Sequence, residues 1–450
     1  MKWITRILHG AESGPRKGEN GKPEGTAAAA SISGDNPIRR PEDDVLGRAQ
    51  VAQRFAEQAL SLDVTEGVVV GVLGPWGSGK TSFVNLARAH FEGNCVAVLD
   101  FNPWMFSGAE QLVDSFFAEL SAQLQLRPGL ADVGKYLQDY GETFSGMGWL
   151  PVVGTWVERL RLVTRILGKT LQHRKGGMGP RRARVRKALA ALDRPLVVVL
   201  DDIDRLTTSE VRDVFRLVRL TANFPNVIYI LAFDRVRVEA ALAEQGVPGR
   251  DYLEKILQVG IDLPAVPAHV LSRQIFGAVD EALATIDKKG PFDEGVWPDV
   301  FMEVIRPLIR NMRDVRRFGA AVHGAVGGLD GQVALVDVIA IEAIRVFLPD
   351  VFRQLHGSVD ALTTTSDIGH GGRGASDQLK KQIDQLIEAA GPRADVVRAL
   401  VQRLFQGAQR HIGGSHYGSE WKRRWLRERR VARETQARRS QHSRSPARQT

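Results

Sequence analysis

The chain has 450 residues, of which 43% are hydrophobic, so it is long and apolar enough for a large protein with two or three cores. Its one cysteine, Cys95, excludes a disulfide framework and favours a reducing, cytoplasmic setting, and the start of the chain lacks the apolar core of a secretory signal. Cys95 falls in a predicted strand, so we expect a buried, inert thiol.

The net charge of +9 is unevenly distributed along the chain. Residues 421–450 hold eleven Lys and Arg residues against Glu428 and Glu434, so the rest of the chain is neutral overall. Residues 1–40, with a Gly-, Glu- and Pro-rich stretch and an alanine run, are predicted to be a disordered leader. A basic tail is predicted over residues 411–450.

The middle of the chain predicts an α/β core followed by a helical domain. The core is expected over residues 41–264, with an insertion at about 125–190, and the helical C-terminal domain over 265–410. Apolar runs predict strands at 68–73, 96–101, 196–200 and 227–233. Helical spacing of apolar residues follows at 270–286, 300–322, 333–347 and 379–404. The fold class is therefore α/β, with a mostly parallel sheet and flanking helices.

A phosphate-binding loop follows the first predicted strand. The loop residues are Gly74, Pro75, Trp76, Gly77, Ser78, Gly79, Lys80 and Thr81, and Ser82 follows them. Glycines let backbone N–H groups approach phosphate oxygens, and the following helix begins with its positive end at the same place. We predict that this segment binds ATP, with Lys80 on the β and γ phosphates and the Thr81 hydroxyl on Mg²⁺.

Two acidic residues end the uncharged strand at 196–200, where the ligands of parallel sheets bind. Asp201 is predicted to be the carboxylate partner of Mg²⁺. Asp202 is predicted to orient and deprotonate the attacking water. The alternative is that adjacent acids merely end a strand in solvent. Many hydrolases of this type have Glu at the second position, so Asp202 is a departure that bears on the hydrolysis rate.

Six motifs occur in an order and spacing that resemble the KAP family of P-loop NTPases. The motifs are Asp43–Arg48, Gly74–Ser82, Phe101–Trp104, Asp201–Arg205, Leu231–Arg235 and Tyr252–Gln258. The resemblance covers roughly residues 35–355. It implies an ATP-binding, Mg²⁺-dependent NTPase that acts as a conformational switch, and bacterial members of the family are associated with mobile elements and antiphage defence. A nucleic-acid- or membrane-binding scaffold with little turnover is the alternative.

The resemblance also assigns residues outside the loop. Asp234 ends the next strand, where related ATPases place a polar group that senses the γ phosphate; the alternative is a cap of the following helix. Trp104 is expected to pack beside the phosphate loop, although a plain core aromatic is an equal alternative. Arg313 lies just past the core and shares a helix face with Arg316 or Arg317. One of these is expected to contact phosphate in a closed state, and a solvated basic face is the alternative.

The insertion at about 125–190 raises the question of a membrane span, because many KAP proteins carry transmembrane helices at this position. Residues 147–157 are apolar, but charged residues follow at once, so we predict no transmembrane span. An amphipathic helix at 155–171, followed by seven basic residues in 174–187, would suit the inner face of an anionic membrane. A helix packed on the core with a solvated basic linker is the alternative.

The basic tail suggests a polyanionic partner. Trp421 and Trp425 stand four residues apart among Lys and Arg residues, which is typical of a basic helix with aromatics on one side. Such a helix would bind DNA, RNA or an anionic membrane in a salt-sensitive way. The alternative is that the tail only keeps the protein soluble. For the protein as a whole, a second copy of the chain is a further candidate partner.

Overall fold

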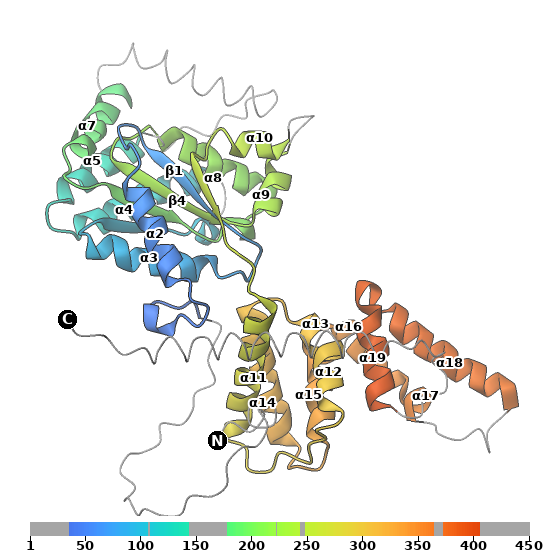
Figure 1. Ribbon diagram of the computed structural model, residues 1–450. Helices are drawn as coiled ribbons and strands as arrows, with labels where there is room; N and C mark the ends of the chain where they lie inside the picture. Colours follow the sequence, from blue (N-terminus) through green and yellow to red (C-terminus); the bar gives the residue numbers. More distant parts are fainter. Residues whose placement is uncertain are drawn as a thin grey trace, which may run out of the picture. The chain divides into compact units, whose positions relative to one another are not determined.

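The computed structural model describes residues 36–106, 109–143, 178–221, 223–243, 248–363 and 372–405 (Figure 1). The chain forms two compact units, an α/β unit at Pro37–Ala265 and a helical unit that begins at Val266. Residues 1–35 of the predicted leader, the amphipathic helix at 155–171 and the two tail tryptophans lie outside the described residues. Residues 36–40 are described, and Ile38 packs against the core of the α/β unit.

A five-stranded parallel sheet forms the centre of the α/β unit. Its order is β2-β3-β4-β1-β5. The strands are β1 (Val68–Leu73), β2 (Ala97–Phe101), β3 (Leu196–Leu200), β4 (Val227–Phe233) and β5 (Val259–Asp262). The predicted fold class is thus confirmed. Because β4 pairs with both β1 and β3, it separates the strand of the phosphate loop from the acidic strand.

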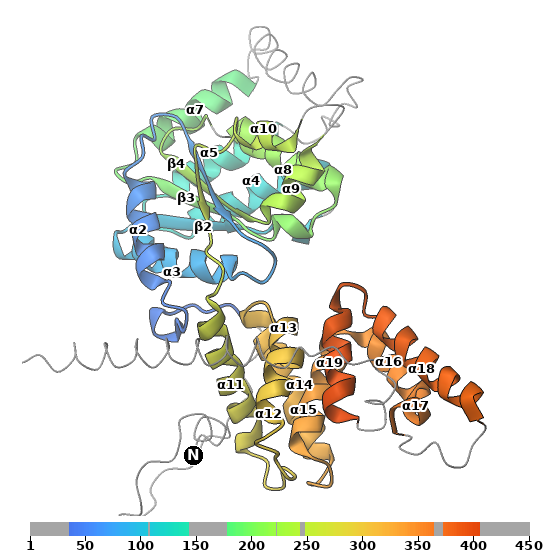
Figure 2. The same cartoon turned by 45° about the vertical axis from the view of Figure 1, so that its right-hand side comes forward.

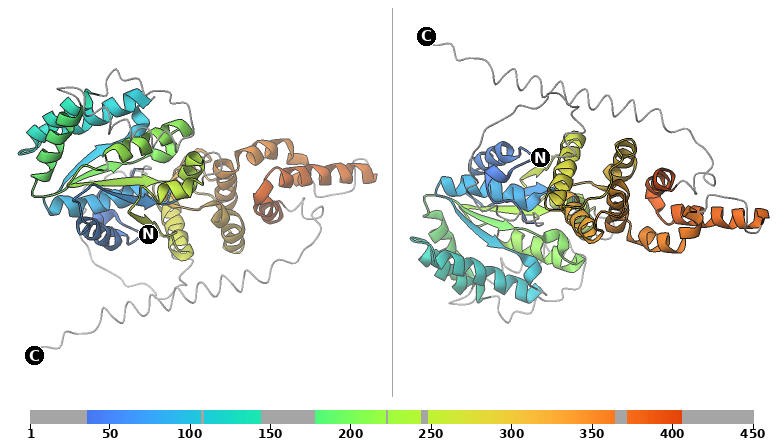
Figure 3. Two further views of the ribbon diagram at one scale, coloured as in Figure 1. Left: turned by 90° about the horizontal axis from the view of Figure 1, so that it is seen from above. Right: turned by 90° about the horizontal axis from the view of Figure 1, so that it is seen from below.

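Helices cover both faces of this sheet (Figure 3). Successive side chains of a strand point to opposite faces, so both faces of the Val-rich strands are buried. One face packs against α2 (Ala49–Leu60) and α3 (Lys80–Gly93). The other face packs against α4 (Ala109–Gln125), α5 (Ala131–Gly141), α7 (Met178–Ala190), α8 (Thr208–Thr221), α9 (Arg235–Leu242) and α10 (Gly249–Leu253).

Figure 2 shows the helices of the helical unit. They enclose one core that includes the fully buried Trp297 and Phe318. These helices are α11 (Ala268–Ala284), α12 (Trp297–Val300), α13 (Arg306–Leu308), α14 (Met312–Gly328), α15 (Leu335–Phe347), α16 (Pro349–Gly357), α17 (Val359–Thr363), α18 (Gly372–Glu388) and α19 (Ala394–Leu404). A π-helical turn at Phe301–Ile305 joins α12 to α13. The helix expected across 300–322 is interrupted, because Ile309 is extended and the Asn311 side chain caps α14.

Cys95 is not the buried strand residue that the sequence predicted. It is exposed, and its backbone has a φ of 57° in the turn between α3 and β2. Its N–H group donates to the carbonyl of Glu92, 3.0 Å away, at the end of α3. The apolar run of β2 therefore begins only after this turn, and the burial argument that holds for Val96 does not extend to Cys95.

Candidate active site

The loop after β1 has the conformation that its glycines permit. Gly77 and Gly79 have φ angles of 80° and 89°, in the left-handed region that side chains with a Cβ atom rarely occupy. A Cβ atom on Gly74 would lie 2.6 Å from the Ser78 hydroxyl. The Gly74 N–H group donates to the carbonyl of Phe233, 3.2 Å away, which fastens the loop to the end of β4.

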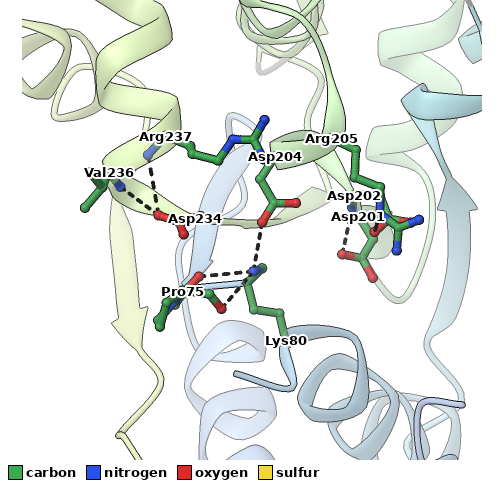
Figure 4. A network of polar contacts seen from close by, with 10 residues as sticks. Pro75, Lys80, Asp201, Asp202, Asp204, Arg205, Asp234, Val236 and Arg237 are labelled. Carbon is green, nitrogen blue, oxygen red and sulfur yellow. Dashed lines mark hydrogen bonds and ion pairs between the residues drawn. The ribbon is translucent and has the colours of Figure 1, made fainter. Parts of the chain in front are cut away.

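Lys80 is the first residue of α3, and its side chain is buried inside the loop (Figure 4). Its ammonium group donates to the carbonyls of Gly74 and Pro75, at 3.1 and 3.4 Å. Its third partner is the buried carboxylate of Asp204, at 2.9 Å. A buried ammonium needs such partners, and carbonyls and a carboxylate supply them here.

Asp204 lies within one of the six sequence motifs, but the pattern predicts no role for it. It belongs to the single helical turn Ile203–Arg205 that follows β3, and only 5% of its side chain is exposed. Figure 4 shows it between Asp234 on one side and Asp201 and Asp202 on the other, with its carboxylate directed at Lys80. The sequence signal that was available is its position three residues after Asp201 in an acidic segment.

Arg48 is a second site residue to which the sequence assigned no role. Its guanidinium donates to the carbonyls of Ser78, in the loop, and of Pro264, the latter at 2.7 Å. Burial lowers the pKa of Arg48, and the nearby Asp44 opposes this shift. Arg48 therefore ties the phosphate loop to the chain that leaves β5. Arg48 is the last residue of the first sequence motif, and this position was the only sequence feature that pointed to a role for Arg48.

The two predicted Mg²⁺ ligands lie together. Burial raises the pKa of Asp201, while hydrogen bonds from the Thr81 hydroxyl and from the N–H group of Asp202, 2.8 Å away, oppose that shift. A hydroxyl beside a carboxylate is an oxygen donor set that suits Mg²⁺. In the described part of the chain, no group of three or more His, Cys, Asp or Glu residues could hold a metal alone.

Asp202 has a different set of partners from Thr81 and Asp201. Its backbone is left-handed, with φ of 60°, and its carboxylate contacts Arg205 Nε at 2.8 Å and accepts a hydrogen bond from Asn102 Nδ2 at 3.2 Å. The Arg205 guanidinium also lies 5.2 Å from the centre of the Trp104 ring. Trp104 thus contacts Arg205 just after β2, an edge strand of the sheet, and because 54% of Trp104 is exposed the alternative of a plain core aromatic is wrong.

The remaining predicted residues have the following surroundings. Asp234 caps α9, since its carboxylate accepts from the N–H groups of Val236 and Arg237 at 3.0 and 3.4 Å. The Ser82 hydroxyl accepts from the N–H group of Ile38. Trp76 is largely exposed in the loop. Arg313 belongs to the helical unit, where its N–H group donates to the capping side chain of Asn311, 2.9 Å away.

A parallel sheet with a phosphate-binding loop after one strand and clustered carboxylates after another defines the P-loop NTPase fold. The family model of the KAP family P-loop domain matches residues 48–325, which is more than half of the chain. The chain belongs to this family, as the sequence motifs predicted.

Similar proteins have been described. The Phage T7 exclusion protein of Escherichia coli (strain K12) is 27% identical over 352 residues, which cover 71% of this chain and 46% of that protein. The chain therefore spans less than half the length of this relative. Among solved structures, the Aeropyrum pernix ORC2 protein in ADPNP–ADP complexes has a TM-score of 0.35 and 11% identity, covering 81% of this chain and 95% of that one. AMPPCP-bound DnaA from Aquifex aeolicus has a TM-score of 0.30 and 14% identity, covering 88% and 98%.

Across the described ranges, every helix is too short or too polar to cross a bilayer.

Proposed function

We propose that the protein binds ATP with Mg²⁺, hydrolyses it, and uses the cycle as a conformational switch. The observation that carries this proposal is the position of Lys80, whose charge lies inside a glycine loop against backbone carbonyls and Asp204. A triphosphate offers the same ammonium group stronger, fully charged acceptors. Membership of the KAP family supports the same function.

The described residues divide the chemistry among them. Loop N–H groups and the start of α3 bind phosphate oxygens, and Lys80 compensates charge on the β and γ phosphates. Thr81 and Asp201 would hold Mg²⁺, which neutralises the charge that develops on the leaving phosphate when it is bound. The sequence assigns the base to Asp202, the γ-phosphate sensor to Asp234 and a phosphate contact to Arg313, and none of the contacts described above tests these three roles.

The biological process is proposed by analogy. The relative from Escherichia coli is named for the exclusion of phage T7, and the KAP family resemblance carries the same association. A cytoplasmic switch that couples hydrolysis to rearrangement between the α/β unit and the helical unit would suit such a role. Assembly with a second copy of the chain is part of this proposal, as in many switch NTPases.

The first experiment measures ATP binding and phosphate release by the unmodified protein. We expect both with Mg²⁺, and loss of phosphate release when EDTA removes the metal. Parallel titrations with GTP establish the base preference. If neither nucleotide binds at millimolar concentration, the proposal is wrong.

A second function is favoured by the distribution of basic residues. α7 carries five basic residues and no acidic residue, and Arg184 and Lys187 of this helix are exposed. Residues 421–450 add eleven more basic residues. A scaffold that holds ATP with little turnover and binds DNA, RNA or the inner membrane face is therefore the second candidate. ATP turnover that rises when DNA, RNA or anionic vesicles are added would join the two functions.

A further inference from the structure

Three carboxylates in four consecutive residues have three different sets of partners. Asp201 accepts from the Thr81 hydroxyl and the Asp202 N–H group, on the side predicted to hold the metal. Asp202 is held by Arg205 and Asn102, one on each carboxylate oxygen. Asp204 alone of the three is paired with Lys80, the residue that must receive the β and γ phosphates.

We propose that Asp204 is the catalytic base, the carboxylate that accepts a proton from the water that attacks the γ phosphate. This assignment rests on the proposed ATPase function. It gives Asp204 the role that the sequence predicted for Asp202. Asp204 lies in the single helical turn that follows β3, three residues after Asp201, the carboxylate predicted to bind the metal.

The distances support this assignment. Asp204 Oδ2 lies 2.9 Å from the Lys80 ammonium. A phosphate oxygen bound to that ammonium lies about 2.8 Å from it, so the carboxylate and the phosphate oxygen are within roughly 6 Å, which one water can bridge. A base must stand within hydrogen-bond or one-water reach of its proton.

The burial of the Asp204 carboxylate also supports its assignment as the base. Only 5% of the Asp204 side chain is exposed, and Oδ2 accepts no hydrogen bond of normal geometry from another side chain. When a phosphate binds to Lys80 in place of Asp204, the buried carboxylate of Asp204 loses its cationic partner and lies close to the negatively charged phosphate. Accepting a proton removes that cost, whereas the partners of Asp202 are Arg205 and Asn102, neither of which is predicted to bind phosphate.

The water oxygen forms a bond to the γ phosphorus while the bond from that phosphorus to the bridging oxygen breaks. The electron pair of the broken bond stays on the β phosphate of ADP, next to Lys80. One water proton passes to Asp204, which later releases it to solvent. The other stays on the transferred phosphate, so the products are ADP, inorganic phosphate and one released proton.

The test compares Asp204→Asn with Asp202→Asn, a matched change two residues away, by single-turnover hydrolysis and by ATP titration. We expect Asp204→Asn to slow hydrolysis on the order of 10² to 10⁴-fold with ATP affinity unchanged or higher, and Asp202→Asn to slow it less than about 10-fold. Higher affinity is expected because Lys80 no longer has to leave a carboxylate. Equal losses in the two variants, or a larger loss in Asp202→Asn, overturn the assignment.

Asp204→Glu covers the case in which the Asn variant does not fold. It keeps the charge and displaces the carboxylate by one methylene, so a loss of turnover above about 10-fold at unchanged ATP affinity supports the assignment. Turnover within about threefold of the unmodified protein overturns it. Absence of turnover in the unmodified protein overturns the proposed ATPase function and this assignment together, whereas turnover that survives Asp204→Asn overturns this assignment alone.

Discussion

Each of the two units contains a partly or fully buried ion pair whose partners are far apart in the sequence. In the α/β unit, Lys80 meets Asp204 at 2.9 Å. In the helical unit, Arg403 of α19 meets Asp299 of α12 at 2.7 Å and Glu303 of the π-helical turn at 2.9 Å. The lengths are similar, but the surroundings differ.

The difference lies in what else contacts the cation. Arg403 is held by two carboxylates through several donors, which fixes the position of α19 against α12 and the π-helical turn. Lys80 has one carboxylate, and its other partners are carbonyls of a loop whose glycines keep it open to approach. A buried ion pair therefore stabilises the fold where all partners are side chains, and it positions a binding charge where a ligand can replace some of the partners.

Lys80→Ala is expected to have the largest effect. It removes the charge predicted to bind the β and γ phosphates, so ATP affinity should fall by about 1.5 to 3 kcal/mol and turnover should be lost. Isothermal titration with ATP and phosphate release measure the two effects. Lys135→Ala, at an exposed lysine of the same unit, is the control and should change neither. Unchanged ATP affinity in Lys80→Ala would refute the site.

Arg403→Ala tests the other half of the comparison. Two carboxylates lose their partner, and because Arg403 is about one third exposed the expected loss is about 1 to 3 kcal/mol of unfolding free energy. Urea denaturation measures this loss, and ATP affinity should stay within about threefold. A variant with normal stability and weakened ATP binding would reverse the roles that we assign to the two pairs.

Asp201→Asn is expected to have a smaller, pH-dependent effect on stability. Burial raises the pKa of Asp201, so the folded state prefers its protonated form. The stability that this preference provides is full below the ordinary carboxyl pKa of about 3.9 and is lost as the pH rises through the raised pKa. At neutral pH, Asn therefore should raise the melting temperature of the nucleotide-free protein.

The same variant should lose the dependence of ATP binding on Mg²⁺, and in the unmodified protein that dependence should weaken as the pH falls through the raised pKa of Asp201. Melting curves with and without Mg²⁺–ATP, recorded across pH, measure both effects. A variant that still binds ATP more tightly with Mg²⁺ than without it would show that the metal is held elsewhere.

Truncation after Ser419 is expected to have the smallest effect on the ATPase. The residues assigned to the site lie between Arg48 and Arg313, so basal hydrolysis should change less than about twofold. Binding to DNA, RNA or anionic vesicles at physiological salt, where the Debye length is about 8 Å, should be weakened. Equal retention of both forms on all three would leave the tail without a polyanion-binding role.

The sequence predicted more of the sheet than of the site. Four strands were predicted because each is an apolar run, whereas β5 was missed because it is four residues long and includes Gly260 and Asp262. The loop glycines, Lys80 and Thr81 were predicted from a motif that follows a strand, and Asp201 from its place at the end of an uncharged strand. Pairing across the fold is invisible to spacing, so neither the contact of Arg48 with the Ser78 carbonyl nor that of Asp204 with Lys80 was foreseen.

The end of β4 connects the phosphate loop to a helix by a short path. The carbonyl of Phe233 holds the N–H group of Gly74, and the next residue, Asp234, caps α9. A single peptide unit therefore lies between the anchor of the loop and the start of that helix. A displacement of the loop by bound phosphate is expected to reach α9 through rigid backbone, with no relay of side-chain rotamers between them.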